Sequence, residues 1–116
     1  MTKRFLALLI ISATMLAYCS SSRKTSTTSA VNYVSDIQPL VEAKCTPCHI
    51  PSKGGKKLAL DTYHAMSLNI NDVIRRIQLN PGEKGFMPFK HEKLSDSAIN
   101  VFKNWAAAGT PEQSTR

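Results

Sequence analysis

Hydrophobic residues recur at helical spacing in three stretches of the chain. The first set lies at positions i, i+3 and i+4, the second continues this series to i+7, and the third forms one stripe at spacings of three and four residues. The three sets are Ile37, Leu40 and Val41; Ile70, Val73, Ile74 and Ile77; and Ala98, Ile99, Phe102, Trp105 and Ala106. Each set would form the apolar face of an amphipathic helix, so the pattern predicts an all-α domain without a sheet.

Polar and turn-forming residues indicate where these helices begin and end. The expected N-caps are Ser35 or Asp36 for the first helix, Asp61 for a brief helical turn containing Tyr63 and Met66, and Ser95 for the last helix. The expected ends are Asn80-Pro81-Gly82 after the middle helix and Gly109 with Pro111 after the last one. We expect residues 53–57 to form a loop and Trp105 to pack in the core against the first helix.

A short apolar run near the N-terminus predicts export. Lys3 and Arg4 precede the run, which covers residues 5–17, and this is the layout of a secretory signal. The run is too short for an integral membrane helix, which needs roughly 20 apolar residues. The sequence Leu16-Ala17-Tyr18-Cys19 resembles a bacterial lipobox, which implies a lipid anchor on Cys19. Tyr18 replaces the small residue usual at that place, so ordinary signal-peptidase cleavage nearby is the alternative.

The segment after Cys19 has the composition of a flexible tether. Residues 20–29 are Ser, Thr, Arg and Lys, with nothing apolar to order them. Such a segment reaches on the order of 20 Å, which would hold a small domain clear of a membrane. The predicted organisation is a signal peptide (1–18), a tether (19–32), one domain (33–111) and a polar tail (112–116), in a periplasmic protein anchored to a membrane by lipid.

Length and charge narrow the class of protein further. The chain has 116 residues, which suits one small domain and excludes two. Its 15 basic and eight acidic residues give a formal charge of +7, and without Lys3 and Arg4 the charge is +5. Nucleic acid is not an expected partner for an exported protein. The basic excess therefore serves solubility or the docking of an acidic protein.

The sequence Cys45-Thr46-Pro47-Cys48-His49 has the C-x-x-C-H pattern by which c-type haem is attached. In that chemistry Cys45 and Cys48 form thioethers with the two haem vinyl groups, and His49 provides an imidazole nitrogen to the iron. A chain this small has a marginal hydrophobic core. One covalent haem c would therefore be structural as well as functional.

Two other kinds of site use the same pair of cysteines. A thioredoxin-like dithiol needs a βαβ pattern nearby, and nothing in the sequence provides a parallel sheet. A structural zinc site needs a second pair of ligands at suitable spacing, and His64 and His91 are too scattered to supply it. Covalent haem is the interpretation that the motif favours.

The second axial position of the iron has four candidates downstream of the motif. Met87 lies in Gly85-Phe86-Met87-Pro88-Phe89, where the proline biases it toward an extended conformation and stiffens the loop. Met66 falls on the expected helical turn and is more simply core filler, while His64 and His91 have charged or polar neighbours typical of a surface. We expect Met87 to be the distal ligand, with a vacant or exchangeable position as the alternative.

These motifs together resemble a known family. The segments that carry the resemblance are Asp36-Ile37-Gln38-Pro39-Leu40, Lys53-Gly54-Gly55, Leu60-Asp61-Thr62-Tyr63, Met87-Pro88 and Lys93-Leu94-Ser95-Asp96. Over about residues 34–111 the chain is similar to the small monohaem c-type cytochrome domain common in exported proteins of Bacteroidetes and Planctomycetes. The resemblance implies a class I cytochrome c fold of three to five short helices, with Cys45 and Cys48 attached to haem, His49 proximal and Met87 distal. Phe89 departs from the family pattern, which usually has a second proline there, and Lys56-Lys57 is an extra basic pair.

The sequence therefore predicts a cytochrome that carries single electrons between redox partners. His and Met ligands suit both oxidation states of the iron, and no second set of acid, base or nucleophile indicates an enzyme. Two alternatives are a haem-based ligand-binding or sensor domain and a haem subunit of a larger respiratory or dehydrogenase complex. Lysines on both sides of the motif and of Met87 predict an acidic redox partner that binds transiently.

Overall fold

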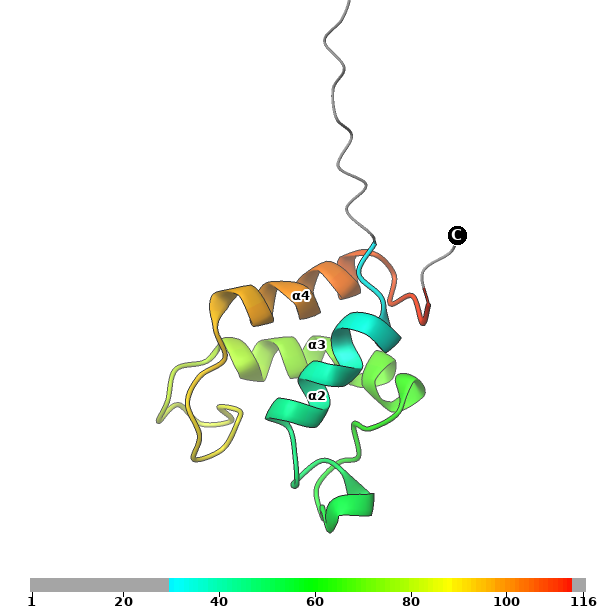
Figure 1. The fold of residues 1–116 in the computed structure, drawn as a ribbon. Helices are drawn as coiled ribbons and strands as arrows, with labels where there is room; N and C mark the ends of the chain where they lie inside the picture. Colours follow the sequence, from blue (N-terminus) through cyan, green and yellow to red (C-terminus); the bar gives the residue numbers. More distant parts are fainter. Residues whose placement is uncertain (1–29, 114–116) are drawn as a thin grey trace, which may run out of the picture.

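The regular structure of the chain is helical throughout the described part. The computed structural model describes residues 30–113, and no strand occurs among them. One turn of π-helix, η1 (Tyr33–Ile37), runs directly into α2 (Gln38–Lys44), and a short 3₁₀ turn, η2 (Pro51–Lys53), precedes the two longer helices, α3 (Tyr63–Gln78) and α4 (Asp96–Ala107). Figure 1 shows α4 lying along α3, with the chain of η1 and α2 passing in front of α3. The prediction of an all-α domain is confirmed for this part of the chain.

The predicted signal and the candidate lipidation residue Cys19 lie outside the described residues. Within residues 30–113, no helix has the length and apolar character needed to cross a membrane.

The first helix begins earlier than the sequence predicts, because Asn32 caps it. The side-chain oxygen of Asn32 accepts a hydrogen bond from the Ser35 N–H at 3.0 Å, and the Asp36 carboxylate accepts one from the Asn32 N–H at 2.9 Å. This reciprocal pair resembles a capping box, with the returning carboxylate one residue after the usual position, so the prediction of Ser35 or Asp36 as the N-cap is wrong. Asn32 is buried and Val31 packs against the core, although the sequence placed both of them in the tether.

The middle of the chain forms one helix where the sequence predicted a brief turn followed by a separate helix. Thr62, rather than Asp61, is the N-cap of α3, and its hydroxyl accepts a hydrogen bond from the Ala65 N–H at 3.2 Å. Met66 continues the buried stripe of Ile70 one turn toward the N-terminus, so a single 16-residue helix buries the whole row. The helix ends at Gln78, just before the predicted stop at residues 80–82.

Helix α4 closes the core around the only tryptophan of the chain. Ser95 caps α4 as predicted, and Gly109 adopts a φ of +81° just past its end, as expected of a C′ glycine. Trp105 is fully buried, with its ring centroid 5.9 Å from that of Tyr33. The predicted packing of Trp105 against the first helix is therefore confirmed.

The two ends of the domain are joined by main-chain hydrogen bonds. The Tyr33 N–H donates to the Pro111 carbonyl at 2.9 Å, and the Val34 N–H donates to the Glu112 carbonyl at 3.2 Å. The indole N–H of Trp105 also donates to the Pro111 carbonyl, at 2.9 Å. In Figure 1 the cyan start and the red end of the described chain accordingly lie together, near the C-terminal end of α4.

Candidate functional site

The two cysteines and the histidine of the motif lie on one helical turn that follows α2. The Cys45 N–H donates to the Val41 carbonyl at 2.9 Å, and the His49 N–H donates to the Cys45 carbonyl at 3.1 Å. Both thiols are free; Cys45 is half-buried and Cys48 is exposed. The local sequence thus places all three predicted attachment residues within one short turn.

The Cys45 thiol is neutral at physiological pH. Burial raises its pKa to about 11 from an ordinary value of 9.0, because an apolar environment disfavours the thiolate. The reactive cysteine of a thioredoxin-like dithiol has a lowered pKa instead. Together with the helical surroundings, this argues against the dithiol interpretation of the motif.

The imidazole of His49 is oriented by a main-chain acceptor. Its Nδ1 lies 2.6 Å from the carbonyl oxygen of Leu58, so Nδ1 carries the proton and donates it to that carbonyl. The other ring nitrogen, Nε2, then has a free lone pair. Metal-binding histidines typically show this arrangement, in which a hydrogen bond at one nitrogen fixes the ring and the tautomer for ligation at the other.

The segment that carries Leu58 runs alongside the motif. The Lys57 N–H donates to the Cys48 carbonyl at 3.1 Å, and the Leu60 N–H donates to the His49 carbonyl at 3.0 Å. These two bonds fix Leu58 between them, which places its carbonyl at the imidazole. Sequence reasoning missed the Leu58 carbonyl, because a main-chain acceptor leaves no trace in residue identity.

Gly55 allows the loop after the motif to approach it closely. A Cβ atom at Gly55 would lie 2.3 Å from the Pro47 carbonyl oxygen and 2.6 Å from that of Cys48. No side chain fits there, whereas Gly54 beside it faces open space with a φ of +84°. The Gly54-Gly55 pair was thus a visible signal of a loop, and the close approach explains why the second glycine is needed.

Met87 lies on the loop between α3 and α4, apart in sequence from the motif. It is half-buried and packs against the core, and its N–H donates to the Arg76 carbonyl on α3 at 3.3 Å. Among the other candidates, Met66 is fully buried in the core while His64 and His91 are exposed. The burial of these residues agrees with their predicted environments.

Exposed apolar side chains flank both parts of the candidate site. Leu58 is 57% exposed and Phe89 is 66% exposed; Leu58 provides the acceptor for His49, and Phe89 follows Met87 by two residues. A large apolar plate would remove such side chains from water at about 25 cal/mol per Å² of covered area. Two thiols, an oriented imidazole, a thioether and exposed apolar side chains are the kinds of group that covalent haem would require.

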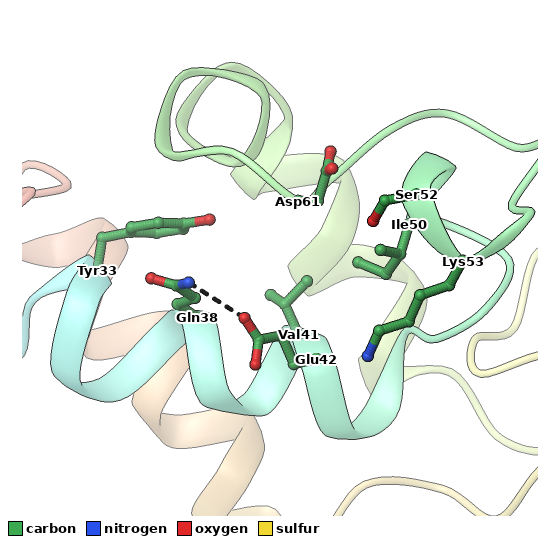
Figure 2. A pocket seen from close by; sticks show the side chains of 8 residues that line it. All are labelled: Tyr33, Gln38, Val41, Glu42, Ile50, Ser52, Lys53 and Asp61. Carbon is green, nitrogen blue, oxygen red and sulfur yellow. Dashed lines mark hydrogen bonds between the residues drawn. The ribbon is translucent and has the colours of Figure 1, made fainter.

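A small cavity in the described part lies between the η1–α2 helix and the η2 turn (Figure 2). It has a volume of about 180 Å³ and contains none of the four predicted haem-binding residues. Its lining residues are Tyr33, Gln38, Val41, Glu42, Ile50, Ser52, Lys53 and Asp61. Ligand pockets usually measure about 300–1,000 Å³, so this cavity is too small for haem. In residues 30–113, no three His, Cys, Asp or Glu side chains are grouped as metal ligands.

Positive charge surrounds both segments of the candidate site. The lysines near the motif and near Met87 are all exposed; they are Lys44, Lys53, Lys56, Lys57, Lys84 and Lys90.

Comparison with known proteins identifies no relative of this chain. No family model, curated protein or solved structure matches it.

Proposed function

We propose that the chain is a monohaem c-type cytochrome with a class I cytochrome c fold. Cys45 and Cys48 would hold one haem c through thioethers, and His49 and Met87 would bind its iron. When bound, the haem supplies an iron that changes reversibly between the ferrous and ferric states. The chain's own residues hold it, orient its ligands and shield it from water.

The contact between His49 Nδ1 and the Leu58 carbonyl is the observation that carries the proposal. A C-x-x-C-H sequence can occur by chance, but a chance occurrence would not need an imidazole whose Nδ1 lies 2.6 Å from a main-chain carbonyl acceptor. This hydrogen bond leaves Nε2 free, which is the arrangement typical of metal-binding histidines. It therefore supports a ligand role for His49 on chemical grounds independent of the motif.

The function we infer is the transfer of single electrons, without catalysis of a substrate reaction. A Met thioether raises the potential of haem relative to two imidazoles and suits an electron carrier. We further propose that the protein is exported to the periplasm, that Cys19 carries a lipid anchor, and that its partners are acidic redox proteins. A haem-based sensor would differ in having a Met87 ligand that dissociates easily.

The direct test is covalent haem in protein produced together with a haem-attachment system. We expect haem staining on a denaturing gel, where only covalent haem remains with the chain, and loss of that stain in Cys45→Ala combined with Cys48→Ala. Wild-type protein that carries no haem after denaturation would contradict the proposal.

The axial ligands are tested by spectroscopy of the same protein. Ferric haem with thioether sulfur shows a weak charge-transfer band at long wavelength; Met87→His should abolish this band and lower the reduction potential. Met66→Leu is the matched control, because Met66 is fully buried in the core, and it should leave both properties unchanged. Loss of the band in Met66→Leu instead would show that Met87 is not the ligand.

A further inference from the structure

Arg76 attaches the Met87 loop to α3 through both its main chain and its side chain. Its carbonyl oxygen accepts a hydrogen bond from the Met87 N–H at 3.3 Å, and its Nη1 donates to the Gly85 carbonyl at 3.4 Å. The residue between these two contacts, Phe86, is buried. Arg76 therefore contacts the loop on both sides of the buried Phe86, directly where Met87 begins.

The guanidinium of Arg76 is itself fixed by Asp72, one turn earlier on α3. Its Nε donates a hydrogen bond to Asp72 Oδ2 at 2.6 Å, while Asp72 Oδ1 accepts one from the Nε of Arg75. These two guanidinium groups lower the pKa of the Asp72 carboxyl below its ordinary value, which keeps the carboxylate charged. Because Nε is directed at Asp72, Nη1 is oriented toward the loop.

The end of α3 is a suitable place for such an attachment. The last four carbonyl groups of a helix have no helical donor, and two of them are satisfied from the loop. Met87 provides its N–H to Arg76, and Lys93 provides its ammonium group to the Gln78 carbonyl at 2.9 Å. A lysine is also favoured at this end by the helix dipole.

Gly85 lies beside the guanidinium. Its φ is +95°, and an added Cβ would lie 3.4 Å from Nη1 of Arg76, which is an ordinary van der Waals contact. A side chain at position 85 would therefore be strained by the backbone conformation and not by a lack of space.

We propose that Arg76 is a positioning residue for the Met87 ligand, and that it determines how readily an outside ligand displaces the thioether from the iron. The inference rests on the proposed function, because it requires that Met87 bind the iron. Arg76 does not contact the iron in this proposal. It acts by restricting the loop from which the thioether extends.

The test compares Arg76→Gln with Arg75→Gln in the ferric haem-containing protein. Both variants lose one ion pair with Asp72, but only Arg76 contacts the loop. Imidazole is added and its binding is followed by loss of the thioether charge-transfer band. We expect imidazole to bind about three- to tenfold more tightly to Arg76→Gln, the effect of losing one ordinary hydrogen bond, and with unchanged affinity to Arg75→Gln.

Two further variants extend the comparison. Arg76→Lys keeps the charge but cannot reach Asp72 and the Gly85 carbonyl at once, so it should also bind imidazole more tightly. Asp72→Asn should act in the same direction with a smaller effect, since it releases the guanidinium without removing it. Arg76→Gln should unfold at a slightly lower temperature than Arg75→Gln, because both lose one exposed ion pair and Arg76→Gln also loses the hydrogen bond with the Gly85 carbonyl.

Two results would overturn the inference. Equal imidazole affinity in Arg76→Gln and the wild type would show that the side chain does not restrain the ligand, and equal gains in the Arg75 and Arg76 variants would assign the effect to the helix as a whole. Failure of the proposed function would be recognised separately, because the wild-type protein itself would then carry no covalent haem or show no thioether band.

Discussion

At the scale of single residues, the attachment turn depends on main-chain groups as much as on the side chains of the motif. The carbonyl of Leu58 orients His49, and the carbonyls of Pro47 and Cys48 lie where a Cβ of Gly55 would be. Substitution of Leu58 leaves its carbonyl in place. Gly55 therefore offers the more direct test of how the loop supports the turn.

We expect Gly55→Ala to destabilise the protein by about 2–3 kcal/mol, within the range for overpacking. The reason is that the new methyl group meets main-chain oxygens that cannot rotate away. Haem incorporation should fall as well, because the displaced atoms belong to the attachment turn. Urea unfolding and the haem content per chain measure the two effects.

Gly54→Ala is the matched control, since Gly54 has a φ of +84° but open space around it. It should cost about 1 kcal/mol, from backbone conformation alone, and leave haem incorporation unchanged. Equal losses of stability in the two variants would mean that the close approach at Gly55 has no energetic effect.

At the scale of elements, the C-terminal half of α3 combines core packing with an ion pair at its surface. The Asp72 carboxylate forms ion pairs with both Arg75 and Arg76. These interactions lower the pKa of its carboxyl. A carboxyl with a lowered pKa in the folded chain stabilises the fold above its ordinary pKa, near 4. That stabilisation is lost as the pH falls through the lowered value.

The corresponding variant is Asp72→Asn, compared with the wild type over a series of pH values. We expect its melting temperature to lie below that of the wild type at neutral pH, and the two to converge as the pH falls through the lowered pKa of the wild-type carboxyl, which then also becomes neutral. Thermal unfolding followed by circular dichroism gives the comparison. A difference that stays constant throughout the acid range would show that the carboxylate charge is not what stabilises α3.

The elements also show what sequence reasoning can and cannot reach. The apolar stripes and the Ser95 cap depend on residues a few positions apart, and both were predicted. The caps of η1 and α3 were missed because several cap-forming residues stand side by side, and tertiary packing selects among them. Asn32 prevails because the chain before Tyr33 packs against the core.

The candidate site likewise contains residues that the local sequence predicts and contacts that it does not predict. Cys45, Cys48 and His49 follow from a local pattern, whereas the supporting contacts join residues far apart in sequence. The contact of His49 with Leu58 spans nine residues, as does that of Arg76 with Gly85. Such contacts depend on the path of a loop, and no periodicity in the sequence encodes that path.

At the scale of the whole molecule, charge is the property that a partner would meet first. Six exposed lysines lie on the two segments that carry the proposed haem ligands. Electron carriers bind briefly through interfaces below about 1,200 Å², where opposite charge mainly increases the rate of association. The basic surface therefore favours an acidic redox partner.

We expect electron transfer with such a partner to slow as salt rises, because the Debye length falls to about 8 Å at physiological ionic strength. Lys56→Glu combined with Lys57→Glu should slow the reaction at low salt and flatten this dependence. Stopped-flow mixing with an acidic redox protein over a range of salt concentrations measures both.

The control is Lys103→Glu, an exposed lysine on α4 and outside both segments, which should have a smaller effect. An electron-transfer rate that does not change with salt or with any of the three substitutions would favour the alternative of a permanently assembled haem subunit. In such an assembly, association is not the slow step.

The hydrogen bonds that join the two ends of the domain have a consequence for how it can be built into larger proteins. Because Tyr33 bonds to Pro111 and Val34 to Glu112, a polypeptide enters and leaves the domain at one point, as is common for domains that tolerate insertion and circular permutation. The domain could therefore be inserted into a surface loop of a host protein without separating the two ends of that loop. A permuted chain, with its old termini linked by a few glycines and new ones opened in the exposed loop near Gly82, would retain the same core.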